Sequence, residues 1–150
     1  MPAGRCHMGG EPAVEAAVAI VLVALGGGLG AVARFWLSGL IARRFGEAFA
    51  LGTLVVNVSG AAAIGMLAAL LLAEGGVALT RGPAWEALVI GFLGSYTTVS
   101  SFSLQTLALA RQGQAGRALA NIALSLVLCL AAAAAGLAVM RALLAGGGAE

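Results

Sequence analysis

The sequence of 150 residues contains no lysine and no aspartate, and charged residues make up only 9% of it. Soluble domains typically carry about 25% charged residues, so this scarcity excludes an ordinary soluble domain. Hydrophobic residues make up 61% of the chain, and its mean hydropathy is +1.05. We therefore expect an integral membrane protein.

Residues that support enzymatic or redox chemistry are also scarce. The only histidine is His7, and the two cysteines are Cys6 near the N-terminus and Cys129 within the last apolar stretch. No cysteine or serine has a base beside it within an apolar stretch, and no spacing typical of metal ligands appears. We expect neither a disulfide framework nor an enzyme. The net charge of +2, without any basic run, argues against nucleic acid as a partner.

The few charged residues separate four long apolar stretches. These stretches lie between Glu15 and Arg34, Glu47 and Glu74, Glu86 and Arg111, and Arg117 and Arg141. A helix needs roughly 20 residues to cross a hydrocarbon core of about 30 Å. The first stretch reaches that length because apolar residues continue from Phe35 to Leu37. We predict an all-α membrane protein with four transmembrane helices, at residues 14–40, 49–73, 84–111 and 115–144.

The predicted helices imply a simple domain organisation. It comprises a disordered N-terminal tail at residues 1–12, a four-helix transmembrane domain at 13–145 and a C-terminal tail at 146–150. A cleaved signal peptide is the competing hypothesis for the N-terminus, with Arg5 before the apolar stretch and small residues at 31–33 as the cleavage site. That stretch is long for a signal peptide, and its glycine run at 26–30 suits a helix packed tightly on a neighbour.

The distribution of arginines carries the signal for membrane orientation. The chain ends and the loop after the second helix carry Arg5, Arg81 and Arg141, whereas the other two loops carry Arg43, Arg44, Arg111 and Arg117. Because the bias of positive residues sets orientation, this near balance predicts a weak preference or insertion in both orientations. Both orientations would allow an antiparallel dimer. Alternatively, the small excess places the loops with four arginines in the cytoplasm.

Polar side chains concentrate in the middle of the third predicted helix. Gly91 and Gly94 precede eight hydroxyl residues between Ser95 and Thr106. A few Ser or Thr residues in a membrane helix can bond to their own backbone, but this density favours an interruption of the helix. An interruption frees carbonyl groups, which a bilayer tolerates only where a cavity or a ligand satisfies them. Free carbonyls suit a hard cation, whereas free N–H groups and hydroxyls suit an anion.

The other predicted helices contain a few further polar positions. Asn57 is the only amide in the second helix, and its role is either interhelical hydrogen bonding or contact with an anion through its N–H donors. Arg34 either snorkels to the interface or faces a pathway. In the fourth helix Asn121, Ser125 and Cys129 recur at four-residue spacing and share one face. This stripe is either coincidental or a pore lining.

Three segments together resemble the Fluc (CrcB) family of fluoride channels. Residues 26–35 (GGGLGAVARF) are similar to the family's glycine and arginine motif in its first helix. Residues 52–60 (GTLVVNVSG) are similar to its second-helix motif, and residues 91–103 (GFLGSYTTVSSFS) to its third-helix signature. The segments occur in the family's order, and the resemblance covers about residues 14 to 144.

The resemblance implies a fluoride-specific ion channel that exports toxic fluoride passively across the inner membrane of a bacterium. It also implies a four-helix channel domain that forms an antiparallel homodimer with two pores, and a structural sodium ion at the dimer centre. The sodium ligands would be the backbone carbonyls of Gly94 and Thr97. The fluoride pathway would comprise the amide of Asn57, the ring edge of Phe102, the hydroxyls of Thr98, Ser101 and Ser125, and Arg34.

The sequence departs from the family's pattern at three positions. Val99 stands where the first of two phenylalanines is usual, Ser95 where a second glycine is common, and Cys129 where a hydroxyl is expected. A valine offers no polarised ring edge, so one expected contact with the anion is missing. The protein would then conduct less well, use other contacts, or pair with a second family member.

The sequence leaves two other functions open. A small multidrug-type exporter also has four helices, but it needs a carboxylate deep in its first helix, and Glu15 lies at the edge of that helix. A membrane assembly protein that transports nothing would use the polar cluster of the third helix for packing. Transport measurements with the purified protein distinguish these functions.

Overall fold

The computed structural model describes residues 11–46, 51–73, 82 and 85–147, and every regular element within them is a helix. The elements are α1 (Glu11–Phe45), α2 (Leu51–Ala73), η2 (Glu86–Leu93), α4 (Gly94–Tyr96), α5 (Val99–Arg111) and α6 (Ala115–Gly147). The stretches that are long and apolar enough to cross a membrane are Ala13–Phe45, Leu51–Ala73, Glu86–Arg111 and Ala115–Gly146. The structure thus contains four helical stretches with the length and composition predicted for membrane spans, and η2, α4 and α5 together form the third.

Two helices extend further than their predicted bounds. α1 begins at Glu11 and continues to Phe45, and α6 continues to Gly147. Both extensions run into residues predicted as tails, because the apolar periodicity that marks a span does not define where helical bonding stops. The remainder of the two tails lies outside the described residues, so the division into domains stays a prediction.

Two glycines with left-handed backbone conformations end α1 and α5. Gly46 has a φ of 78°, and its N–H bonds to the carbonyl of Ala42 at 2.9 Å. Gly113 has a φ of 74° and lies in the short turn between α5 and α6. Glycine adopts this conformation without a steric penalty and commonly terminates helices. The turn at Gly113 allows α6 to fold back against α5.

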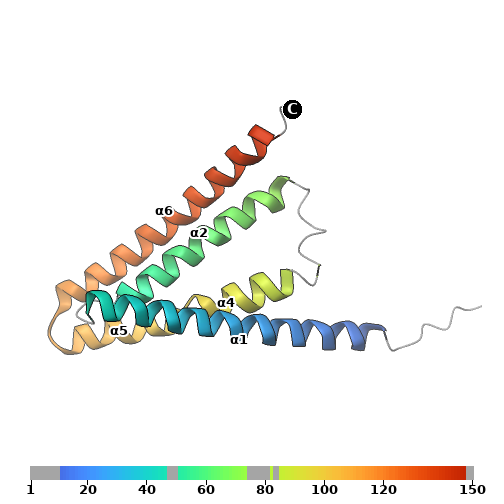
Figure 1. The fold of residues 1–150 in the computed structure, drawn as a ribbon. Coiled ribbons are helices and arrows are strands. Elements are labelled where there is room, and N and C mark those ends of the chain that lie inside the picture. The colour runs from blue at the N-terminus through green and yellow to red at the C-terminus, as the bar shows by residue number, and fades with distance from the viewer. Residues whose placement is uncertain (1–10, 47–50, 74–81, 83–84, 148–150) are drawn as a thin grey trace, which may run out of the picture.

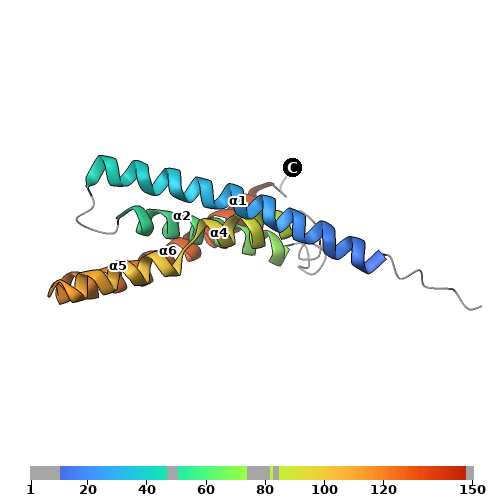
Figure 2. The ribbon, with the colours of Figure 1, turned by 90° about the horizontal axis from the view of Figure 1, so that it is seen from below.

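The helices form two pairs that diverge from each other (Figure 1). α2 packs along α6, and α1 packs along η2 and α4. After α4 the third span changes direction, so that α5 leaves the line of α1 and packs on α6 (Figure 2). The first part of α2 lies between the end of α1 and α5, where polar residues of three helices can meet.

Glycines allow the backbones of both pairs to approach closely. A Cβ atom added to Gly136 would collide with the carbonyl oxygen of Ala62, and one added to Gly65 would collide with that of Ala133. One added to Gly26 of α1 would likewise collide with the backbone of η2. Lipid tails are as apolar as the helices, so association in a bilayer depends on such close contacts.

Most large apolar side chains lie on the outside of the single chain. Val56 is fully buried, whereas Leu119, Val127 and Leu130 of α6 are 66%, 61% and 64% exposed. A soluble monomer rarely exposes apolar surface on this scale. In a bilayer the same surface meets lipid tails or a partner helix, which agrees with a multi-pass membrane protein.

We expect Gly136→Ala to lower the thermal stability of the protein in detergent. The added methyl group would meet the carbonyl of Ala62, so α6 must move away from α2 at a cost of about 1–3 kcal/mol. Gly116→Ala is the matched control in the same helix, because a Cβ atom there meets nothing within 4 Å. Thermal unfolding of both variants tests this expectation, and equal melting temperatures would contradict close packing of α2 on α6.

Candidate functional site

The third span is interrupted at two residues between α4 and α5. Thr97 has φ −76° and ψ 153°, and Thr98 has φ −148° and ψ 122°, so both are extended. The N–H of Thr97 still bonds to the carbonyl of Leu93 at 3.1 Å, and this is the last helical hydrogen bond before the interruption. The predicted interruption is thereby confirmed.

A single side chain of α2 pairs with the extended backbone. Asn57 donates from Nδ2 to the carbonyl of Thr98 at 2.9 Å and accepts at Oδ1 from the N–H of Thr98 at 2.8 Å. The carboxamide therefore bonds to Thr98 as a neighbouring strand would. Its nitrogen carries a second hydrogen, which remains available. Interhelical hydrogen bonding by Asn57 is present, and its contact with an anion stays a prediction.

The side chain of Thr98 caps the second half of the span. Its Oγ1 accepts from the N–H of Ser101 at 3.2 Å, which is the usual arrangement at a helix N-terminus. The same oxygen lies 3.2 Å from the hydroxyl of Ser100 and 3.2 Å from that of Ser101. Three of the predicted pathway residues, Asn57, Thr98 and Ser101, thus belong to one hydrogen-bonded group.

The carbonyl groups of Gly94 and Thr97 are among those that the interruption leaves free of helical bonds. In a continuous helix the carbonyl of Gly94 would accept from the N–H of Thr98, which here bonds to Asn57. The carbonyl of Thr97 would accept from the N–H of Ser101, which here bonds to Oγ1 of Thr98. No other backbone N–H among the described residues replaces these donors. Carbonyl oxygens suit a hard cation, so the free groups fit the sodium ion that the resemblance implies.

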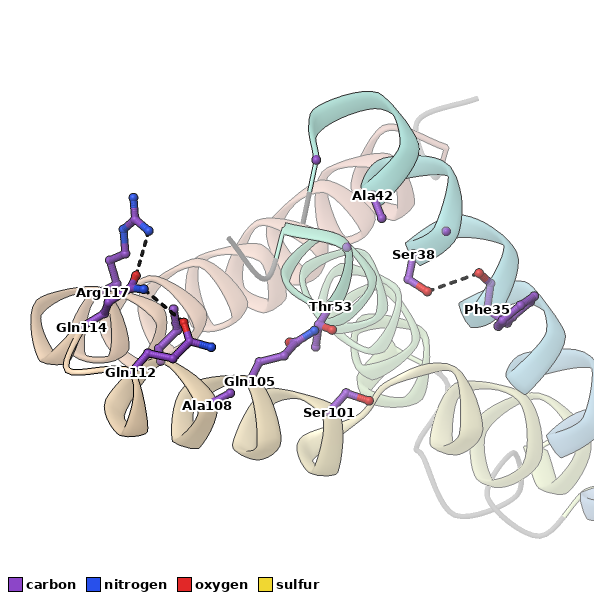
Figure 3. Close-up of a pocket in the computed structure, with 14 residues that line it drawn as sticks. Phe35, Ser38, Ala42, Thr53, Ser101, Gln105, Ala108, Gln112, Gln114 and Arg117 are labelled. Atoms are coloured by element: carbon purple, nitrogen blue, oxygen red, sulfur yellow. Dashed lines mark hydrogen bonds between the residues drawn. The ribbon is translucent and has the colours of Figure 1, made fainter. Parts of the chain in front are cut away.

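A groove of about 650 Å³ opens beside the hydrogen-bonded group, between the end of α1, the start of α2 and α5. Thr53 of α2 faces Gln105 of α5 across it, and Ser101 lies one turn from Gln105 (Figure 3). Ser38 contributes a hydroxyl from α1. The groove therefore gathers hydroxyl and amide groups from three helices.

Polar side chains continue along the groove to the turn between α5 and α6. Arg117 donates from Nη1 to Oε1 of Gln114 at 2.8 Å, and Gln114 donates from Nε2 to Oε1 of Gln112 at 3.1 Å. Arg117 is the one charged residue among those of the described chain that line the groove. The described lining, with its hydrogen-bond donors, one positive charge and no carboxylate, favours anions over cations.

Thr53 and Gln105 are groove residues that the sequence pattern did not single out. Thr53 precedes Asn57 by four residues, and Gln105 follows Ser101 by four residues, so each shares a helix face with a predicted pathway residue. This four-residue spacing is the feature of the sequence from which both groove residues could have been predicted. The Oε1 atom of Gln105 is buried, and none of the described residues donates a hydrogen bond to it. Since an unpaired buried acceptor is costly, a water molecule or another donor is expected in the groove.

Asn121 connects α6 to α5 rather than lining the groove. It is 1% exposed, and its Nδ2 donates to Oγ1 of Thr106 at 2.8 Å. Thr106 in turn donates to the carbonyl of Phe102 at 2.8 Å. The three residues of the polar stripe of α6 therefore differ in their surroundings. Asn121 is buried and joins two helices, whereas Ser125 and Cys129 are half-buried.

Of the predicted pathway residues, Ser101 alone is among the described residues that line the groove, and Asn57 and Thr98 lie in the hydrogen-bonded group beside it. Arg34, Phe102 and Ser125 are half-buried, and none of them lines the groove. Their place in a pathway stays a prediction. Ser95, which departs from the family's glycine, faces α1 at Gly27, where a Cβ atom would lie 3.1 Å from its hydroxyl. The larger side chain fits because the facing residue is glycine.

A family model described as CrcB-like protein, Camphor Resistance (CrcB), matches residues 21–137. The chain belongs to this family. The matched range includes the helix break, the described residues that line the groove and most of each of the four spans. The family expected from the three sequence motifs is confirmed.

Relatives with channel names match most of this chain. It is 57% identical over 124 residues to fluoride-specific ion channel FluC 2 of Rhodopseudomonas palustris, which covers 83% of this chain and 94% of the relative. It is 49% identical over 130 residues to FluC 2 of Bradyrhizobium diazoefficiens, with 87% and 93% covered. It is 54% identical over 110 residues to FluC of Opitutus terrae, with 73% and 83% covered. These names confirm the expectation that the protein is not an enzyme.

We expect Thr98→Val to destabilise the second half of the third span. Valine keeps the shape of threonine but lacks Oγ1, so the N–H of Ser101 loses its cap at a cost of about 1 kcal/mol. Thr98→Ser retains the acceptor and is the matched control. Thermal unfolding in detergent should give the lower melting temperature for Thr98→Val, and the reverse order would show that Oγ1 does not stabilise α5.

Proposed function

We propose that this CrcB-family protein is a fluoride-specific ion channel through which toxic fluoride leaves a bacterial cell passively across the inner membrane. The observation that carries the proposal is the groove between α1, α2 and α5, whose described lining offers donors and one arginine but no carboxylate. At Ser101 the groove meets the hydrogen-bonded group of the helix break. The names of the relatives supply the identity of the anion.

The donors of the groove suit the hydration chemistry of fluoride. Fluoride holds water strongly, so a pore must replace that water with donors and still release the ion. The hydroxyls of Thr53 and Ser101 and the amide of Gln105 line the groove, and the second N–H of Asn57 is a further donor in the hydrogen-bonded group beside it. The edge of the Phe102 ring carries partial positive charge and is a further contact for the anion. Neutral donors bind an anion less strongly than charged donors do, which allows the ion to leave.

An antiparallel homodimer with two pores is the assembly that we assign to this function. The exposed apolar side chains of α6 and the near balance of arginines are compatible with it. Arg34, Phe102 and Ser125 lie outside the groove of one chain, so each pathway would be completed by residues of two chains. The carbonyls of Gly94 and Thr97 of both chains would hold a structural sodium ion, which would offset the partial negative charge of their oxygens.

A multidrug-type exporter is the weaker candidate. Proton exchange for a cation requires an acidic residue deep within a span. Within the four spans of the described chain, the acidic residues are Glu15 and Glu86, and both lie near the end of their span. The interior of the spans therefore offers hydroxyls and amides but no proton acceptor of the required kind.

We expect the purified protein in liposomes to release fluoride quickly and to retain chloride. The release needs no energy source, because the fluoride gradient drives it. A fluoride electrode and a chloride electrode measure the two fluxes, and liposomes without protein are the control. Absence of fluoride release would favour the assembly protein that transports nothing, and equal chloride release would contradict fluoride specificity.

We expect Val99→Phe to raise the rate of fluoride release. Val99 is 77% exposed on the single chain, so a ring there meets no obstacle within the chain and offers the anion a polarised edge. Val99→Leu is the matched control, since it adds bulk without such an edge. The initial rate of release from liposomes is the measurement. A fall for the phenylalanine variant alone would indicate that the pore is adapted to valine.

A further inference from the structure

The hydrogen bonds of Asn57 connect the anion pathway to the proposed cation site. We propose that Asn57 is a positioning residue for sodium, which builds the ion's site by directing the carbonyls of Gly94 and Thr97 away from helical bonding. The inference rests on the proposed function, because it concerns the structural sodium ion of that function. It gives Asn57 a role that does not require contact with the anion.

The direction of the Thr97 carbonyl follows from one hydrogen bond. This carbonyl and the N–H of Thr98 belong to the same peptide unit. The described residues contain no cis peptide bond, so the two groups point in opposite directions. Because the N–H points at Oδ1 of Asn57 with a distance of 2.8 Å, the Thr97 carbonyl points away from Asn57. Oδ1 therefore sets the direction of one proposed ligand.

The same hydrogen bond keeps the carbonyl of Gly94 available. In an unbroken helix the N–H of Thr98 would donate to it. Here that N–H is held by Asn57, and no other backbone N–H of the described chain bonds to the Gly94 carbonyl. One side chain thus acts on both proposed ligands, by orienting the first and by removing the donor that would occupy the second.

A second hydrogen bond makes the arrangement rigid. Nδ2 of Asn57 donates to the carbonyl of Thr98 at 2.9 Å, so the carboxamide holds both main-chain groups of one residue. Rotation of Thr98 into a helical conformation would break both of these bonds. Gly60, almost one turn further along α2, lies against the side chains of Thr97 and Tyr96. α2 therefore holds the break by packing as well as by hydrogen bonds.

The charge state of Asn57 suits a role beside a cation and an anion. A neutral carboxamide does not repel sodium, and its Oδ1 already accepts from the N–H of Thr98. A cation on the Thr97 carbonyl would polarise the peptide and strengthen the N–H of Thr98 as a donor to Asn57, because hydrogen bonds in a chain polarise one another. Binding of sodium would then hold Asn57 more firmly, with its second N–H left for the anion.

Sodium-dependent stabilisation of the purified protein tests the inference without a transport measurement. A ligand that binds only the folded state raises the melting temperature. We expect the wild-type protein in detergent to melt at a higher temperature in sodium chloride than in the same concentration of N-methylglucamine chloride. Asn57→Ala should lose this difference. Where Asn57→Ala does not fold, Asn57→Ser serves, because its shorter side chain cannot reach both groups of Thr98.

Asn121→Ala is the matched control. It also removes a buried interhelical amide, but this amide bonds to Thr106 and not to the break. We expect it to lower both melting temperatures and to keep the difference between the two salts. If Asn57→Ala keeps the difference, or if Asn121→Ala loses it equally, the inference is wrong.

Asn57→Asp separates the two roles of this residue. A carboxylate retains an acceptor for the N–H of Thr98 but repels an anion. We expect this variant to keep the sodium-dependent difference and to lose fluoride release from liposomes, and loss of the difference would overturn the role of Oδ1. A wild-type protein without the difference would refute the inference while its fluoride release still stood. Absence of fluoride release with the difference intact would instead contradict the proposed function.

Discussion

The structure depends on how a helix can be interrupted inside a bilayer without leaving costly main-chain groups unpaired. At Thr98 the solution is a side chain from another helix, since Asn57 bonds to both its N–H and its carbonyl. Oγ1 of Thr98 then accepts from the N–H of Ser101 in the first turn of α5. Carbonyls at the end of the first half of the span remain, those of Gly94 and Thr97 among them, and a hard cation is a suitable partner for such groups.

The position of the break is maintained by packing of the helices on each side. Tyr96 stacks on Phe92 with ring centroids 5.8 Å apart, and its hydroxyl lies 2.8 Å from that of Ser59 in α2. The winding of η2 as a π-helix, with the N–H of Gly94 bonded to the carbonyl of Val89, precedes this contact. α1 lies close against η2 because glycine occupies the contact at Gly26. The break therefore lies between two helices that each contact it closely.

The interruption brings chemically opposite groups together. Carbonyl oxygens at the end of α4 carry partial negative charge, and N–H groups at the start of α5 carry partial positive charge. A broken helix in a membrane can therefore serve a cation and an anion at nearby points. The groove with Thr53, Ser101 and Gln105 extends from the side of α5, where donors are available. This arrangement explains why a proposed cation site and a proposed anion pathway share Asn57.

The sequence by itself determined the four spans, because charges are excluded from hydrocarbon, and the place of the break, because its hydroxyl residues are unusually dense. It also carried the motifs that identify the family. It did not determine the partner of Asn57, which lies 41 residues away at Thr98, or the opposition of Thr53 and Gln105 across the groove. Periodicity specifies which residues share a helix face, but only the packing of helices distant in sequence decides which faces meet.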